Sequence, residues 1–279
     1  AEVGPDCLIV VRWFEAHQTL AEPERAAEEW VARHYHDMRA MADGDPNVVF
    51  EGYNEIPDSM APAFARFELR RLALMHAAGL RAGVGSWSVG TPDLHVWQIY
   101  RPVLAAMRPG DVVCLHEYWA DGNDIGNHWF TARFAHPAVA PYLVGRRIAI
   151  TEIGRDVIRE ADGRVRGARG WQRSCDADTF FDELRAYDAL IGQHPRVIGA
   201  TVFDDGSPDA EWHPYSPAPV WGRVVAEYTP ATPAKGDDMT TVRVWRRGMR
   251  RVDTIELELY VRGVLPREMP ASWPLEALK

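Results

Sequence analysis

Short apolar segments recur along the chain, and segments with helical periodicity lie between them. Six segments are rich in β-branched residues and are predicted to be strands, namely 8–14, 48–53, 81–84, 112–116, 148–151 and 197–203. Their first residues lie about 31 to 49 positions apart, which is the length of one strand, one helix and their loops. The pattern therefore indicates repeated strand–helix units up to about residue 222.

The segments between the strands carry apolar side chains every three or four positions. In 23–41, Ala27, Trp30 and Val31 begin one such face, and Pro23 stands in the first turn, where proline suits a helix. The same period recurs in 96–107 and 180–191. These helices are expected to pack their apolar faces against a sheet.

Nearly all-apolar strands that alternate with amphipathic helices predict a parallel sheet, either doubly wound or closed as a barrel. Polar residues follow the strands, as in a barrel enzyme, whose chemistry lies at the carboxyl ends of several strands. No glycine-rich turn of the nucleotide-binding kind follows Phe14. We therefore predict an α/β fold of the TIM-type (β/α)8 barrel class. The polar ends read Arg12-Trp13, Asn54-Glu55, Trp87, His116-Glu117-Tyr118, Glu152 and Asp204-Asp205.

The composition narrows the functional classes. With 279 residues, of which 47% are hydrophobic and 25% charged, the chain is typical of a globular protein with a large core. A net charge of −9 argues against nucleic acid as a partner, and the apolar runs are too short to span a membrane. Three widely spaced cysteines suggest neither a disulfide framework nor a zinc site. No metal and no cofactor are expected.

Two glutamates each stand directly after an apolar strand, Glu55 at the end of 48–55 and Glu152 at the end of 148–152. At one rim of a barrel their carboxyl groups can face each other. Hydrolysis of a glycosidic bond needs such a pair, and a separation of about 5–5.5 Å makes one carboxylate the nucleophile and gives retention of configuration. A single glutamate at a strand end is usually a solvated residue, but two in this arrangement favour catalysis.

Three motifs resemble the clan of retaining barrel glycoside hydrolases that includes cellulases and β-galactosidases. Gly52-Tyr-Asn-Glu-Ile-Pro57 is similar to the end of the clan's fourth strand, and Ile150-Thr-Glu-Ile-Gly154 to the end of its seventh. His116-Glu-Tyr118 is similar to its sixth-strand His-x-Tyr. The resemblance implies a glycosidase in which Glu55 is the acid/base and Glu152 the nucleophile.

The same resemblance assigns roles to neighbouring residues. Asn54 would hydrogen-bond the sugar 2-hydroxyl, and Tyr118 would donate to the Glu152 carboxylate, although a turn cap and a packing residue are the alternatives. Glu117 is expected on the opposite side of its strand. Further candidates for substrate binding, for which packing is the alternative, are His116, Trp87, Phe203, Trp13 and Arg12.

Two departures from the clan are visible, since Ile56 separates Glu55 from Pro57, and Phe203 stands where a tryptophan usually forms the sugar platform. If Glu55 ends strand four, the six strands are strands three to eight, and a barrel domain over 1–228 lacks its first two strands. The strands at 8–14 and 197–203 should then fail to pair, since two strands are missing between them.

The tail has a different character. Residues 229–239 have the composition of a linker, rich in proline and small residues. Residues 240–279 resemble the opening of the stage II sporulation protein D family, whose members act on peptidoglycan, and Glu268 and Glu276 are its acidic candidates. This resemblance implies an extracellular or cell-wall-associated protein whose partner is a polysaccharide or peptidoglycan glycan.

Two rival interpretations stay open at this stage. The first is a catalytically inert barrel that binds glycan and positions the peptidoglycan-active tail. The second is a metal-dependent hydrolase, which would need His116 to converge with other ligands, with Asp204, Asp205 and Glu117 as candidates, although no HxH or HExxH spacing supports it.

Overall fold

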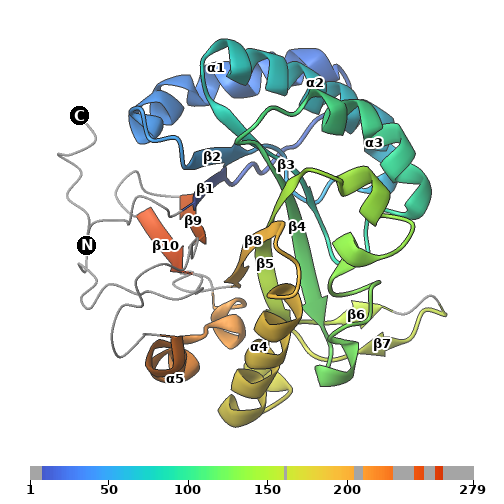
Figure 1. The fold of residues 1–279 in the computed structure, drawn as a ribbon, viewed down its shortest axis with the longest axis vertical. Helices are drawn as coiled ribbons and strands as arrows, with labels where there is room; N and C mark the ends of the chain where they lie inside the picture. Colours follow the sequence, from blue (N-terminus) through green and yellow to red (C-terminus); the bar gives the residue numbers. More distant parts are fainter. Residues whose placement is uncertain (1–7, 160–161, 204–209, 229–241, 248–254, 260–279) are drawn as a thin grey trace.

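The computed structural model describes residues 8–159, 162–203, 210–228, 242–247 and 255–259, with 225–228 and the last two ranges as backbone only. Six parallel strands form an open, barrel-like sheet in the order β1-β2-β3-β4-β5-β8 (Figure 1). The predicted α/β barrel class is therefore confirmed. Within the described residues an α-helix follows each of these strands except β4, which short 3₁₀ turns connect to β5. The strands are β1 (Leu8–Trp13), β2 (Val48–Glu51), β3 (Arg81–Trp87), β4 (Val112–Trp119), β5 (Arg147–Arg155) and β8 (Val197–Val202).

Helices cover the outer side of this sheet, as Figure 1 shows for the arc of helices outside β1 to β4. The predicted helix at 23–41 extends over 23–42, with Pro23 in its first turn. Its buried face includes Ala27, Trp30 and Val31. The helices are α1 (Pro23–Ala42), α2 (Ala61–Ala77), α3 (Leu94–Ala106), α4 (Ala177–Ile191) and α5 (Ala218–Tyr228).

The alternation of side chains along the strands produces two layers of core. The large layer lies between sheet and helices, and its most buried aromatic residues include Trp30, Phe64 and Trp97. A smaller apolar cluster comprises Leu8, Val10, Val49, Val112, Cys114 and Ala149, which come from β1, β2, β4 and β5. Because side chains alternate, the positions that continue this cluster toward the strand ends are Arg12, Glu51 and His116. The interior of the barrel thus turns from apolar to charged along the strands.

The predicted lack of pairing between the first and last strands is confirmed within the described residues. No pairing joins β1 to β8. Instead β9 (Val242–Arg247) pairs in parallel with β1, and β10 (Ile255–Leu259) pairs antiparallel with β9, so that the tail continues the sheet (Figure 1). The division into a barrel, a linker over 229–239 and a separate domain from 240 stays a prediction.

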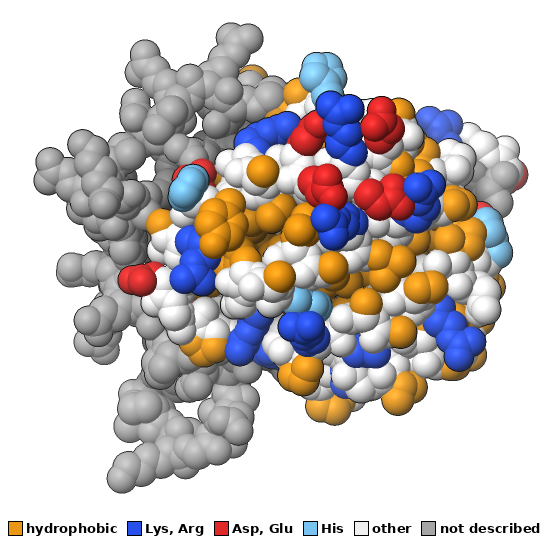
Figure 2. All heavy atoms as spheres, turned by 90° about the horizontal axis from the view of Figure 1, so that it is seen from above, with side chains coloured by type: hydrophobic (Ala, Val, Ile, Leu, Met, Phe, Trp, Pro, Cys, Tyr) orange, Lys and Arg blue, Asp and Glu red, His pale blue; other side chains and the backbone are white. Residues whose placement is uncertain are grey.

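The outer face of α1 and α2 carries paired charges, visible as adjoining red and blue side chains in Figure 2. Arg66 lies 2.6 Å from Glu24, and Arg70 lies 2.7 Å from Glu28. Such exposed pairs each contribute little, about 0–1 kcal/mol. No helix in the described part of the chain is long and apolar enough to cross a membrane.

Candidate active site

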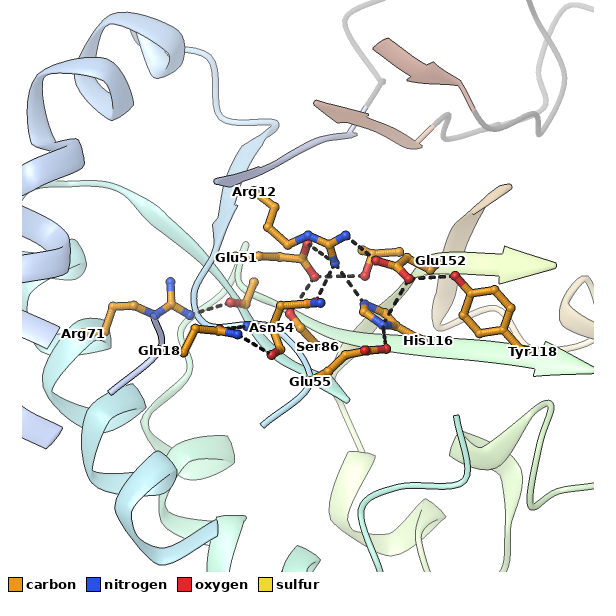
Figure 3. A network of polar contacts seen from close by, with 12 residues as sticks. Arg12, Gln18, Glu51, Asn54, Glu55, Arg71, Ser86, His116, Tyr118 and Glu152 are labelled. Atoms are coloured by element: carbon orange, nitrogen blue, oxygen red, sulfur yellow. Dashed lines mark hydrogen bonds and ion pairs between the residues drawn. The ribbon is translucent and has the colours of Figure 1, made fainter. Parts of the chain in front are cut away.

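The charged residues that end the strands meet at one end of the sheet. Figure 3 shows Arg12 from β1, Glu55 after β2, His116 from β4 and Glu152 from β5 pointing toward one another. Extended strands place them there, because the carboxyl ends of parallel strands share one rim. The two candidates for catalysis, Glu55 and Glu152, are therefore brought together.

Glu152 is a buried carboxylate surrounded by donors. The Tyr118 hydroxyl donates to its Oε2 at 2.7 Å, as the motif resemblance implied. The Arg12 guanidinium donates from Nη2 to its Oε1. A hydroxyl and a fixed cation together stabilise an ionised carboxylate in a buried position. Burial raises the pKa of Tyr118 well above its ordinary value, and the nearby Glu152 adds to this, so that the hydroxyl keeps its proton.

Glu55 lies in a different environment. Its side chain is 37% exposed, while that of Glu152 is 7% exposed. Its backbone has a φ of 52°, an unusual left-handed conformation for a residue with a side chain. The backbone N–H donates to the Ser86 carbonyl at 2.9 Å, which holds this turn in place. Such strain at a site that the surrounding structure fixes is frequent where function requires a particular side-chain direction.

The two carboxyl groups are close together. An oxygen of Glu55 and an oxygen of Glu152 lie within 4.8 Å of each other. Inverting glycosidases need about 6.5–9.5 Å to leave room for a water molecule, whereas retaining enzymes use about 5–5.5 Å. An upper bound of 4.8 Å between these two oxygens leaves less room than the inverting spacing needs, and the catalytic roles of the two residues stay a prediction.

His116 bridges the two glutamates. Its Nδ1 lies 2.9 Å from Glu55 Oε1 and 3.5 Å from Glu152 Oε2. Its Nε2 lies 3.1 Å from Arg12 Nη1, and because a guanidinium can only donate, Nε2 accepts and the proton of the neutral ring is on Nδ1. Burial lowers the pKa of His116, but the charges of Glu152 and Glu55 outweigh it, so that the pKa is raised overall.

Arg12 contacts Asn54, His116 and Glu152 and so lies at the centre of the polar network at this rim. Glu51 is a further member of this network, which sequence reasoning missed. Glu51 Oε1 accepts from Ser86 Oγ at 2.7 Å and from Thr151 Oγ1 at 2.9 Å. Its Oε2 has no hydrogen-bond partner among the described residues and lies 3.7 Å from Arg12 Nη1. The available signal was a carboxylate inside the apolar run of 48–51, four positions before Glu55.

Asn54 is held from two sides. Its Oδ1 accepts from Arg12 Nη1 at 2.8 Å, and its carbonyl accepts from Gln18 Nε2 at 2.9 Å. Gln18, which the sequence did not single out, also accepts from the Asn54 backbone N–H. The Asn54 side chain therefore lies beside Arg12 in the network, where its amide NH₂ group is a donor that a ligand hydroxyl could use.

Three aromatic residues expected to bind substrate are core residues instead. Trp87 has no exposed surface and packs edge-on against Phe64 and Tyr100. Trp13 is 7% exposed and stacks on His34. Trp13 alternates with the inward-facing Arg12, and the irregularity between Gly85 and Trp87 changes the register at Trp87, so that both rings lie in the large core layer, where a large apolar surface is most stable.

Phe203 is likewise buried, at 5% exposure, and packs edge-to-face against Tyr118 with ring centroids 6.2 Å apart. It therefore supports Tyr118 and presents little surface to a sugar. The expected orientation of Glu117 is confirmed, because it accepts from the backbone N–H groups of Ala132 and Arg133 and from the Tyr187 hydroxyl, away from the site.

A metal ion could be held by Glu55, His116 and Glu152, because their ligand atoms lie close to one another. Against this stands the Arg12 guanidinium, which hydrogen-bonds Glu152 and faces His116, since a second cation there would be repelled. Glu117, a ligand candidate for the metal hypothesis, does not converge with His116. The candidates Asp204, Asp205, Glu268 and Glu276 lie outside the described residues.

Comparisons with known proteins bear on both parts of the chain. The family model described as stage II sporulation protein matches residues 246–279, which confirms the resemblance of the tail. No curated protein matches the sequence.

Solved structures similar to this protein include several glycoside hydrolases. An endoglucanase is 12% identical with a TM-score of 0.42 and matches 66% of this chain. An endo-β-1,4-glucanase from Xanthomonas axonopodis pv. citri is 14% identical with a TM-score of 0.47, over 75% of this chain and 67% of its own length. The catalytic domain of a mannanase from Streptomyces sp. SirexAA-E is 16% identical with a TM-score of 0.43, over 75% of this chain.

This chain spans 60% of the endoglucanase and 60% of the mannanase domain. The resemblance to barrel glycoside hydrolases thus extends to solved structures. At these identities and TM-scores it concerns the fold, and no activity follows from it.

Proposed function

We propose that this protein is a retaining glycoside hydrolase that acts on a polysaccharide or a cell-wall glycan. The single observation that carries the proposal is the pair of Glu55 and Glu152, whose nearest oxygens lie within 4.8 Å of each other at the carboxyl ends of two strands. The different surroundings of the two carboxyl groups support different roles for them.

Glu152 is proposed as the nucleophile. Its buried carboxylate, with Tyr118 and Arg12 as donors, is suited to remain ionised and fixed in direction. One of its oxygens attacks the anomeric carbon and forms a glycosyl ester while the bond to the departing oxygen breaks. As the ester forms, the charge leaves the carboxylate, and the same donors stabilise the leaving carboxylate in the second step.

Glu55 is proposed as the acid/base. It is the more exposed of the two, and His116 Nδ1 hydrogen-bonds its Oε1 at 2.9 Å. In the first step its proton passes to the departing oxygen. In the second step its carboxylate takes a proton from water, whose oxygen attacks the anomeric carbon and releases Glu152, so that both groups return to their initial states.

The alternative, an inert glycan-binding barrel that positions a peptidoglycan-active tail, receives less support from the site. Binding alone requires neither a short carboxylate spacing nor a buried arginine against one carboxylate, an arrangement that costs desolvation energy. The match of residues 246–279 to the sporulation family nevertheless supports peptidoglycan as a candidate glycan. An extracellular or cell-wall-associated location follows from the same proposal.

Azide rescue of two variants tests the proposed roles. Aryl β-glycosides with a good leaving group serve as probes, with glucose, mannose and N-acetylglucosamine as the sugar. Glu152→Gly should lose activity and, with azide, yield a glycosyl azide of inverted configuration. Glu55→Ala should yield an azide of retained configuration, because its glycosyl ester still forms. The reverse assignment of the products, or unchanged activity of either variant, would refute the roles.

A further inference from the structure

We propose that Trp129, in the loop after β4, is a sugar-binding platform on the side of the site where the departing part of the glycan lies. The inference rests on the proposed function and adds a binding residue to it. Flat aromatic faces bind the apolar face of a pyranose ring, so the ligand class is a β-linked oligosaccharide. The following contacts carry the argument.

Trp129 is exposed, whereas most of the tryptophans whose side chains the structure describes are buried. It is 37% exposed, whereas Trp30, Trp87, Trp97 and Trp119 have at most 1% exposure. Single exposed apolar residues are common, so exposure alone means little. What distinguishes Trp129 is that its exposed ring is also held in place.

Two contacts hold the ring, and a third holds the backbone of Trp129. The Arg133 guanidinium lies over it, 4.0 Å from the ring centroid. Gly90 lies against its edge, where a Cβ atom would stand 3.3 Å from the indole Nε1. The Trp129 backbone N–H donates to Asn127 Oδ1 at 3.1 Å. Because Arg133 covers one face, the opposite face is the one that a ligand can stack on.

The loop under Trp129 is anchored from the sheet. Glu117 of β4 accepts from the N–H groups of Ala132 and Arg133, at 2.6 and 3.0 Å. The Arg133 guanidinium also donates to the Pro92 carbonyl in the loop after β3. A platform that is rigid before binding loses little conformational entropy when a ligand is bound. The anchoring is therefore what a binding role requires.

The position of Trp129 relative to Glu55 decides which part of the glycan it would contact. Gly90, against the ring, belongs to the loop that follows β3, and the carbonyl of Ser86 near the end of β3 accepts from the Glu55 backbone N–H. A second link joins the same loops, since Asp93 N–H donates to Asp58 at 2.7 Å. The loop of Trp129 is thus joined through the segment after β3 to the turn that carries Glu55, the proposed proton donor to the departing oxygen, and this connection supports the proposed side.

The test compares Trp129→Ala, Trp129→Phe and a control, Tyr35→Ala, which removes an aromatic ring of 38% exposure from α1. The substrates are β-1,4-linked tetra- to hexasaccharides of glucose, mannose and N-acetylglucosamine, beside the corresponding one-sugar aryl glycosides. We expect Trp129→Ala to raise KM for the oligosaccharides about tenfold with little change in kcat, and to affect the aryl glycosides less. Trp129→Phe should restore most of the affinity, and Tyr35→Ala should behave as wild type.

Binding of the same oligosaccharides to Glu55→Gln, with and without Trp129→Ala, is measured by calorimetry and separates the two proposals. Hydrolysis by wild type with equal KM values for Trp129→Ala would overturn the platform and leave the proposed function intact. Oligosaccharide binding that Trp129→Ala weakens, without hydrolysis by wild type, would overturn the function and support the platform. Wild type that binds none of the oligosaccharides would overturn both.

Discussion

The hydroxyl of Tyr118 and the carboxylate of Glu152 are joined by a hydrogen bond of 2.7 Å across neighbouring strands β4 and β5. A β-bulge in this strand pair shifts the register, so that His116, and not Glu117, stands opposite Glu152. The bulge brings His116 and Tyr118 to the two sides of one carboxylate. The bond is therefore a direct consequence of how the two strands align.

Tyr118→Phe should lower kcat by about 10²-fold, since it removes one fixed donor from the proposed nucleophile and its leaving carboxylate. The matched control is Tyr187→Phe, which removes an equally buried hydroxyl from Glu117, 2.6 Å away and outside the site. Steady-state kinetics should show loss of activity for Tyr118→Phe alone. Equal losses for both variants would mean that the hydroxyl acts through stability and not through Glu152.

The buried Glu117 should make stability depend on pH. Burial raises its pKa from an ordinary 4.5 to about 7, although the Tyr187 hydroxyl and two backbone N–H groups lower it. Between these values the folded state binds a proton that the unfolded state releases. The contribution to stability is therefore full below about pH 4.5 and is lost as the pH rises through about 7.

Glu117→Gln removes this titration. Between pH 4.5 and just above pH 7, the wild type should lose about 3 kcal/mol of its free energy of unfolding through Glu117, and Glu117→Gln should not show this loss. Urea denaturation at several pH values measures the difference. Parallel pH profiles of the two proteins would show that Glu117 is not the titrating group.

Glu51 should matter for activity more than for stability. Glu51→Gln removes the second anion that faces Arg12, 3.7 Å away, so the guanidinium is less well held against Glu152, and we expect kcat/KM to fall about tenfold. The control is Glu68→Gln, in a fully buried pair with Arg71 at 2.6 Å on α2. This control should lose about 3 kcal/mol of stability and keep its activity per folded molecule. A Glu51→Gln variant with unchanged kinetics would remove Glu51 from the network's function.

Much of the fold was predictable because it depends on local periodicity. Buried parallel strands are nearly all apolar, as Val48, Val49 and Phe50 of β2 illustrate, and such runs are visible in a sequence. The strand ends were less predictable. β4 continues to Trp119 and β5 to Arg155, past the polar residues that seemed to end them, since buried polar side chains there satisfy one another.

The site was predictable in part, and for a physical reason. Glu55, His116, Tyr118 and Glu152 each belong to a short motif at a strand end, so their convergence follows from the topology. The aromatic candidates Trp13 and Trp87 were misjudged, because sequence does not show whether a ring at a strand end turns toward the helices or toward the barrel opening. Trp129 and Glu51 were missed, since their roles depend on partners far away in sequence.

The central claim is that Glu152 forms a covalent bond with the sugar, and a trapping experiment tests it most directly. A 2-deoxy-2-fluoro β-glycoside with an activated leaving group, carrying the sugar that the aryl glycosides identify, slows both steps and lets the glycosyl ester accumulate. Mass spectrometry of the intact protein should show one added sugar, and peptide mapping should place it on Glu152. Label on another residue, equal labelling of Glu152→Gln, or turnover of an aryl glycoside to a product of inverted configuration would contradict the account.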